Sequence, residues 1–491
     1  MRTGRCSRGA RGAATAMLRA VPGTRLLAGA ALAAAALAAP APAAPALAAP
    51  APATTAAPRA PEPVFTVPGV HAPGTPSRYD RVRVRRFGSK DARAVLVLVP
   101  GTLGGAADFT LVARALVARV PGLQVWAQMR REGALQDDAV LRAGLAGRAT
   151  PQQVFDFYLG WLANPAIAPH YQPLAPAQFP FVADWGLHVA MDDLHRVVLR
   201  ARAGGRRTVI LGGHSLGGSE AAMYAAWDFA GHAGYKDIAG LVGIDGGPFR
   251  RPAETVAQAR DQLAQLQAKG PWLDLLGLGL PWASGAFAQT AALFALEQPD
   301  APSAGQSFPL LPPAFRPPVP VTNEAQLGFS FDASTSPAAL ALIHVRSGHL
   351  AASGTPRGWV DDGPTPVRAL AETFASAPLA AVDWYYPQRL SIDVGAASKM
   401  TRTAATRFLG LRLRHVREVD VPYYVIQTSL GGAGNTLAAG ARRFVRASRI
   451  PSLTLVDRSR AYSHLDPLLA APARNDFLRT VVPWLRRIVR R

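Results

Sequence analysis

The stretch VILGGHSLGGSEAA, residues 209–222, passes within a few positions from a strand to a glycine-rich corner and then to a helix. Branched apolar residues come first, as in a strand buried on both faces of a sheet. Ser215 follows within Gly-His-Ser-Leu-Gly, and small helix-forming residues continue to position 227. A serine on so sharp a corner takes a strained backbone conformation, for which glycine neighbours leave room. Because its hydroxyl then projects beyond the strand end, the stretch predicts a nucleophilic serine.

Short apolar runs alternate with helical patterns on both sides of this corner. The runs lie at 94–102, 122–128, 207–213, 238–247, 421–428 and 452–457. Residues 81–87 alternate with period two, as an edge strand does, and folded sequence is expected to begin near Tyr79. In the helical pattern that starts at residue 184, Leu187, Met191, Leu194 and Val198 share one face. The alternation predicts an α/β fold, with a mostly parallel central sheet and helices on both faces.

The Gly-His-Ser-Leu-Gly-Gly corner after a strand resembles the nucleophile elbow of the α/β-hydrolase superfamily, in its secreted serine esterase and lipase branch. The resemblance covers about residues 79–247 and 420–491 and does not extend to the residues between them. It implies a Ser–acid–His triad in this chain order and an oxyanion hole made by two backbone amides.

The histidine and the acid that this resemblance requires are assigned from their places in the chain. His464 is the only histidine after the last predicted strand, so it is expected to take the proton of Ser215. Asp245 stands at the end of the strand that contains GLVGIDGG, an arrangement similar to that of pancreatic-type lipases. Asp457, at the end of the last strand, is the alternative acid. Asp466 precedes Pro467 and an apolar run, which predicts the N-cap of the final helix.

The oxyanion hole is expected to use the amide of Leu216 and one amide of the loop PGTLGG, residues 100–105. Relatives carry a His-Gly-x motif in this place, and proline replaces the histidine here. Thr102 is the expected donor, and Leu103 is the alternative. His214, beside the nucleophile, is predicted to be a packing residue.

The alternation of strands and helices fails between 249 and 419, which predicts a cap inserted between two strands of the sheet. Within it, residues 275–296 carry no charge, but Pro281 and several glycines argue against a membrane span. We expect two short apolar helices folded over the serine. A lid that meets lipid at an interface is an open alternative.

The N-terminus has the order of a secretory signal peptide. Arginines precede a short apolar run at 26–39, and Ala46-Leu47-Ala48, with small residues at its first and third positions, offers a cleavage site. Cys6, the only cysteine of the chain, lies before that run, so the mature protein would contain no disulfide. The expected location is therefore extracellular or periplasmic in a bacterium.

The net charge of +21 raises the question of an anionic partner. The arginines are scattered and do not interleave with aromatic residues in a stripe, which argues against nucleic acid. Peripheral contact with a membrane or an anionic cell surface is an open possibility. His188, Asp192 and His195 share a helix face, but solvent exposure explains them better than a metal does. No metal and no organic cofactor is expected.

Together these features predict an exported serine hydrolase that cleaves apolar carboxylic esters, either small molecules or lipids, through an acyl-enzyme. The predicted organisation is a signal peptide at 1–48, an Ala/Pro-rich linker at 49–76, the hydrolase core at 77–248 and 420–491, and the cap at 249–419. Amide hydrolysis or acyl transfer could use the same triad. A non-catalytic envelope binding protein on the same fold is the alternative from another class. The sequence does not predict the oligomeric state.

Overall fold

The computed structural model describes residues 62–490, all of which lie in the unit Ala60–Arg491. The predicted signal peptide and residues 49–61 of the predicted linker lie outside the described residues. Within residues 62–490, no helix combines the length and the apolarity needed to cross a bilayer.

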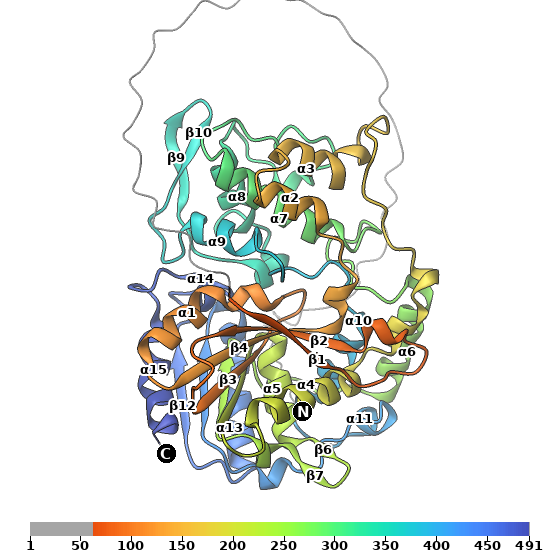
Figure 1. Cartoon of the computed structure of the whole chain (residues 1–491), viewed down its shortest axis with the longest axis vertical. Coiled ribbons are helices and arrows are strands. Elements are labelled where there is room, and N and C mark those ends of the chain that lie inside the picture. The colour runs from red at the N-terminus through yellow and green to blue at the C-terminus, as the bar shows by residue number, and fades with distance from the viewer. Residues whose placement is uncertain (1–61, 491) are drawn as a thin grey trace, which may run out of the picture. The chain divides into compact units, whose positions relative to one another are not determined.

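One eight-stranded sheet forms the centre of the unit (Figure 1). Its order is β1-β2-β4-β3-β5-β8-β11-β12. The strands are β1 Val64–Pro68, β2 Arg81–Phe87, β3 Ala94–Val99, β4 Leu123–Met129, β5 Thr208–His214, β8 Leu241–Ile244, β11 Tyr423–Gln427 and β12 Leu453–Asp457. β2 runs antiparallel to β1 and β4, and every other neighbouring pair is parallel. The prediction of a mostly parallel sheet is therefore confirmed.

The last part of the predicted linker forms β1, which corrects the expected start of the fold. Val64–Pro68 pairs antiparallel with Arg81–Phe87, so β2 is an internal strand and β1 is the edge. Val67 is buried while Thr66 and Pro68 face out, the alternation of a strand buried on one face. The Ala/Pro-rich composition of the preceding residues hides this short pattern.

Helices cover both faces of the sheet, because side chains alternate along its buried strands. Val95, Val97 and Val99 of β3 face α4 Leu187–Arg202 and α5 Leu216–Ala226, and α13 Thr436–Arg446 packs on β11 and β12 in the same hydrophobic layer. Ala94, Leu96 and Leu98 point to the other face, where α1 Thr110–Arg119 and α15 Asp476–Val489 lie. This arrangement gives the two hydrophobic layers of an α/β fold.

Most of the insertion between β8 and β11 covers one end of the sheet (Figure 1). α7 Ala283–Glu297, α8 Asn323–Phe331, α9 Val367–Phe374 and the hairpin β9 His349–Gly354 with β10 Arg357–Val360 form this cap. Three other helices of the same insertion lie beside the core: α6 Val256–Lys269, α10 Gln388–Ala397 and α11 Ala404–Phe408. Leu390 and Val394 of α10 pack among residues of α4 and α5.

A second segment, from the first part of the predicted core, joins this cap. α2 Ala139–Leu145 and α3 Pro151–Tyr158 pack against α7. Tyr158 and Tyr171 lie in one buried cluster with Trp282 and Trp384. The cap is therefore built from two segments, one before β5 and one after β8.

Residues 275–296 form a loop and one helix, where two short helices were predicted. Asp274 accepts hydrogen bonds from the amides of Gly277 (3.1 Å) and Gly279 (2.6 Å), both of which have positive φ. These turns occupy 275–280, and the single helix α7 begins only after Pro281.

Candidate active site

Ser215 lies at the corner between β5 and α5, with φ 54° and ψ −123°. The glycines around it allow a close approach of backbone segments. A β-carbon at residue 217 would lie 2.1 Å from the carbonyl oxygen of Val99, and one at residue 246 would lie 1.9 Å from that of Ser215. The strained serine conformation therefore depends on the absence of side chains at Gly217 and Gly246.

The structure brings His464 and Asp245 together across 219 residues of sequence. Nδ1 of His464 lies 2.6 Å from Oδ2 of Asp245, and both side chains are buried. Asp245 follows β8, and His464 follows β12 in a loop that closes over the same edge of the sheet. His464 and Ser215 line one pocket. The three residues expected to form a triad therefore gather at one place.

Asp245 is held as a carboxylate acceptor by its surroundings. Its Oδ1 accepts hydrogen bonds from the amides of Thr428 (2.7 Å) and Gly431 (3.1 Å), and its Oδ2 accepts one from the Thr428 hydroxyl. Burial raises the pKa of Asp245. The hydrogen bond and charge of His464 and the hydrogen bonds from Thr428 lower this pKa by a larger amount, so the net pKa is below its ordinary value. The carboxylate thus stays ionised at neutral pH.

The alternative acid, Asp457, is placed elsewhere. It is exposed at the end of β12, where its carboxylate accepts hydrogen bonds from the amide (2.9 Å) and hydroxyl (2.7 Å) of Ser459. The structure therefore pairs His464 with Asp245.

Asp466 has a structural place that differs from the predicted N-cap of the final helix. It is the first residue of α14 Asp466–Leu469, whereas Asn475 caps the final helix α15. Its carboxylate accepts hydrogen bonds from the amides of Ser463 and Arg346 and from the hydroxyl of Thr365. Burial raises its pKa to about 6. Asp466 thus ties the loop of His464 to the cap.

His214 does more than pack. Its Nε2 lies 3.0 Å from the backbone carbonyl oxygen of His464, and the two rings lie 4.3 Å apart. Burial, and then the neighbouring His464, lower the pKa of His214 to about 3, so the ring is neutral and its Nε2–H donates to that carbonyl. His214 therefore fixes the backbone of His464, a role that its place beside the serine did not reveal.

The loop expected to supply an oxyanion donor, residues 100–105, lies against Ser215. A β-carbon on Gly101 would lie 2.9 Å from that of Ser215. The amide of Gly104 donates to the carbonyl of Gly101 (3.2 Å), which makes Thr102 and Leu103 the central residues of a tight turn. Leu103 has φ 58°, a strained value for leucine. Leu216 opens α5, where helix amides lack partners within the helix.

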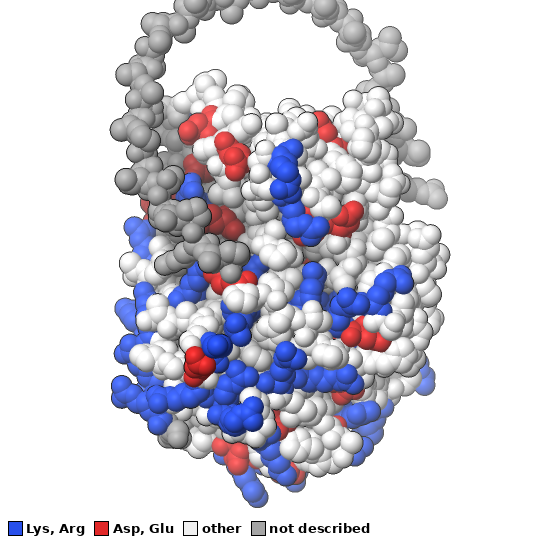
Figure 2. All heavy atoms as spheres, viewed as in Figure 1, with Lys and Arg blue, Asp and Glu red and all other residues white. Residues whose placement is uncertain are grey.

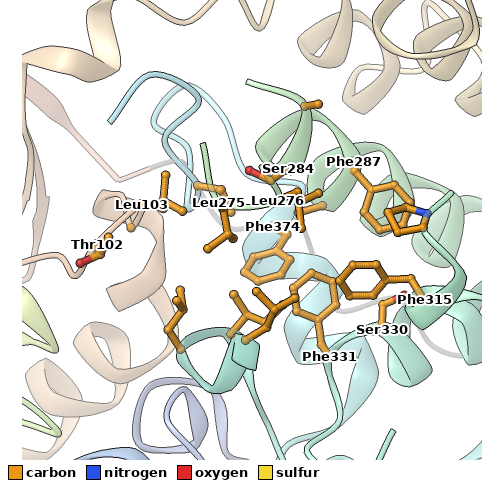
Figure 3. Close-up of a pocket in the computed structure, with 18 of the residues that line it drawn as sticks. Thr102, Leu103, Leu275, Leu276, Ser284, Phe287, Phe315, Ser330, Phe331 and Phe374 are labelled. Carbon is orange, nitrogen blue, oxygen red and sulfur yellow. The ribbon is translucent and has the colours of Figure 1, made fainter. Parts of the chain in front are cut away.

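Residues of α7, α8 and α9 of the cap also line the pocket that Ser215 and His464 line, and Figure 3 shows several of these side chains. The empty space of this pocket is about 1240 Å³, open to solvent, and most of its wall is leucine and phenylalanine. Figure 3 shows Phe331 and Phe374 facing this space from α8 and α9. Leu278 (53% exposed) and Leu310 (52% exposed) also line it and are the most exposed large apolar side chains of the described residues.

Charge is distributed unevenly over the described surface. In Figure 2, Lys and Arg gather over the lower part of this face, which holds the sheet and its helices, and the cap above carries fewer charges.

The helix face with three candidate metal ligands has other contacts. His188 Nε2 lies 2.5 Å from the carbonyl oxygen of Gly410, and His195 Nδ1 lies 2.9 Å from the hydroxyl of Tyr224. Among residues 62–490, His, Cys, Asp and Glu form no group of three or more that could hold a metal.

No family model and no curated protein matches this sequence. Among solved structures, a candidate lipase from Sulfolobus solfataricus is similar at 16% identity and a TM-score of 0.46, covering 86% of this chain and 93% of that one. A monoacylglycerol lipase from Paleococcus ferrophilus shares 11% identity at a TM-score of 0.38, over 83% and 99% of the two chains. An esterase from Thermogutta terrifontis shares 12% identity at 0.36, over 87% and 99%.

These similarities are low, so the fold rests on the chain's own topology. β2 is antiparallel to both of its neighbours. The strands that follow it in the sheet are parallel, in the order β4-β3-β5-β8-β11-β12, and the corner that holds Ser215 joins the central strand β5 to α5. The strand order and the strand–turn–helix corner agree with the resemblance that the sequence suggested. The chain therefore has the α/β-hydrolase fold.

Proposed function

We propose that the protein is a serine hydrolase that cleaves carboxylic esters of apolar acyl groups through an acyl-enzyme. The observation that carries this proposal is the 2.6 Å contact between His464 Nδ1 and the buried Asp245 carboxylate, with His464 and Ser215 facing one apolar pocket. A carboxylate at Nδ1 fixes the tautomer in which Nε2 is free to accept a proton.

In this mechanism Ser215 Oγ attacks the ester carbonyl carbon while His464 Nε2 takes the hydroxyl proton. The carbonyl oxygen becomes an oxyanion, bound by the amides of Leu216 and Thr102. His464 then gives its proton to the alcohol oxygen, which leaves. Water, deprotonated by the same nitrogen, attacks the acyl-enzyme and releases the acid. Asp245 stabilises the imidazolium in both halves of the reaction.

A fluorophosphonate probe tests whether Ser215 is a nucleophile. The folded protein is expected to gain one covalent label, because such probes react with serines activated by a histidine. Mass spectrometry of a digest should place the label on Ser215. Folded protein that takes up no label would exclude the serine hydrolase and favour the non-catalytic binding protein.

A panel of p-nitrophenyl esters with two to twelve acyl carbons tests the acyl preference. We expect kcat/KM to rise with chain length, since each methylene buried in the pocket contributes up to ~0.8 kcal/mol, about fourfold. A kcat/KM that falls beyond four carbons would contradict an acyl role for the pocket.

Matched anilides and an added alcohol acceptor in the same assays separate ester hydrolysis from amide hydrolysis and acyl transfer. A triglyceride emulsion tests whether the segment with the exposed Leu278 and Leu310 is a lid that meets lipid.

We also propose that the protein is exported. The arginines and the apolar run before residue 40 support this proposal.

A further inference from the structure

Arg130 links the two parts of the candidate oxyanion hole. It directly follows β4, and its side chain is 4% exposed. Nη2 donates to the carbonyl of Pro100 (2.5 Å), and Nη1 donates to the carbonyl of Gly101 (3.2 Å). Nη2 also contacts Oε1 of Glu220 at 2.6 Å. Pro100 and Gly101 belong to the loop before Thr102, whereas Glu220 lies on α5, the helix that Leu216 opens.

The geometry of the peptide unit gives the contact with Gly101 a consequence for Thr102. The carbonyl of Gly101 and the N–H of Thr102 belong to one planar trans peptide, in which the two groups point in opposite directions. A donor that holds the carbonyl therefore also sets the direction of the amide. Gly101 and Thr102 both line the pocket, and Figure 3 labels Thr102, so the peptide whose carbonyl Arg130 holds lies in the pocket wall.

The other end of the turn is held by the cap. The amide of Asp383 donates to the carbonyl of Leu103 (2.7 Å), and the amide of Gly105 donates to the carbonyl of Ala381 (2.7 Å). Leu103 is strained at φ 58°. A strained turn needs surroundings that fix it from outside, and Arg130 supplies the contacts on the side of the core.

A buried guanidinium costs free energy that well-placed partners only partly offset. Burial lowers the pKa of Arg130. The carboxylates of Glu220 and Glu132 raise this pKa by a larger amount, so the net pKa is above its ordinary value and the guanidinium stays charged. A charged group is therefore buried under the candidate oxyanion loop despite this cost. Positioning of the loop is a role that accounts for this.

We propose that Arg130 is a positioning residue, which orients the Thr102 amide toward the oxyanion and fixes the loop to the nucleophile helix. This inference rests on the proposed function. The neighbouring Arg131 offers a matched control, because it is equally buried (3% exposed) yet bonds to Asp193, Asp80 and the Val70 carbonyl, away from the loop.

The experiment compares Arg130→Lys with Arg131→Lys in p-nitrophenyl ester hydrolysis. Lysine keeps the charge but cannot hold two carbonyls and a carboxylate in the planar fork of arginine. We expect Arg130→Lys to lower kcat by about 10- to 100-fold with KM changed less than about threefold, since one oxyanion donor is worth about 10²–10³. Arg131→Lys should keep kcat within about threefold while both variants lower the thermal unfolding midpoint.

A second readout separates positioning from general loosening of the fold. A trifluoromethyl ketone forms a bond between its carbonyl carbon and the serine oxygen, and its own oxygen becomes the oxyanion as the serine proton moves to His464. Its inhibition constant should rise in Arg130→Lys by the same factor by which kcat/KM falls, whereas inhibition by the product acid should change little. Equal weakening of both inhibitors would overturn the proposal.

If Arg130→Lys does not fold, Glu220→Gln serves instead, since it leaves the guanidinium in place but removes its carboxylate. The expected change is a three- to tenfold fall in kcat at constant KM, and an unchanged kcat would overturn the proposal. A wild-type protein that neither takes up fluorophosphonate nor hydrolyses any ester would overturn the proposed function itself. Labelled, active wild type with an unaffected Arg130→Lys would overturn only this inference.

Discussion

Ser215→Ala is expected to lower kcat for ester hydrolysis by about 10⁶-fold, because loss of the nucleophile in a triad removes nearly all of its catalysis. KM should stay within about threefold, since the pocket that holds the acyl chain is unchanged. Alanine also has a β-carbon, so the strained backbone at φ 54° is the same and the unfolding midpoint should move little. Steady-state kinetics and thermal unfolding of the purified variant measure these quantities.

Ser219→Ala is the matched control for this prediction. Ser219 is a buried serine one turn further along α5, and its hydroxyl donates to the carbonyl of Gly247 at 2.8 Å. Its loss should cost about 1 kcal/mol of stability and leave kcat within about threefold. A Ser215→Ala variant that retains more than about 1% of wild-type kcat would exclude Ser215 as the nucleophile.

The nucleophile corner could be predicted from sequence because its signals are local. A buried strand, a glycine-flanked serine and a small-residue helix lie within twenty residues, and each leaves its own pattern. The ends of strands are also local signals, which is why Asp245 and His464 could be named as partners. Their 2.6 Å contact could not be derived, since it depends on how β8 and β12 are spaced in the sheet.

Contacts between distant segments explain what the sequence missed. α2 and α3 lie within residues 77–248, which the sequence predicts to be core, yet they pack on α7 of the cap. The contacts of Arg130 are also with distant segments. A single arginine after a strand is indistinguishable in sequence from a solvated one, and only the fold places Pro100, Gly101 and Glu220 around it.

Asp245→Asn is expected to lower kcat by about 10⁴-fold and to leave the fold intact. The reason lies in the donors around this side chain. Oδ1 accepts from two backbone amides, of Thr428 and Gly431, so the oxygen of an asparagine must take that place. Its NH₂ then faces His464 Nδ1, which has to become an acceptor. The proton moves to Nε2, and His464 can no longer take a proton from Ser215.

Asp457→Asn is the control that separates the two candidate acids. Its carboxylate is exposed and bonded to Ser459, so the substitution should change kcat less than about twofold. Both variants keep the shape of the side chain, and their unfolding midpoints show whether each remains folded. A large loss of activity in Asp457→Asn together with a normal Asp245→Asn would exclude Asp245 as the acid. With the expected result, the carboxylate that orients His464 follows β8. In the sheet, β8 is separated by β11 from β12, the strand that precedes the histidine.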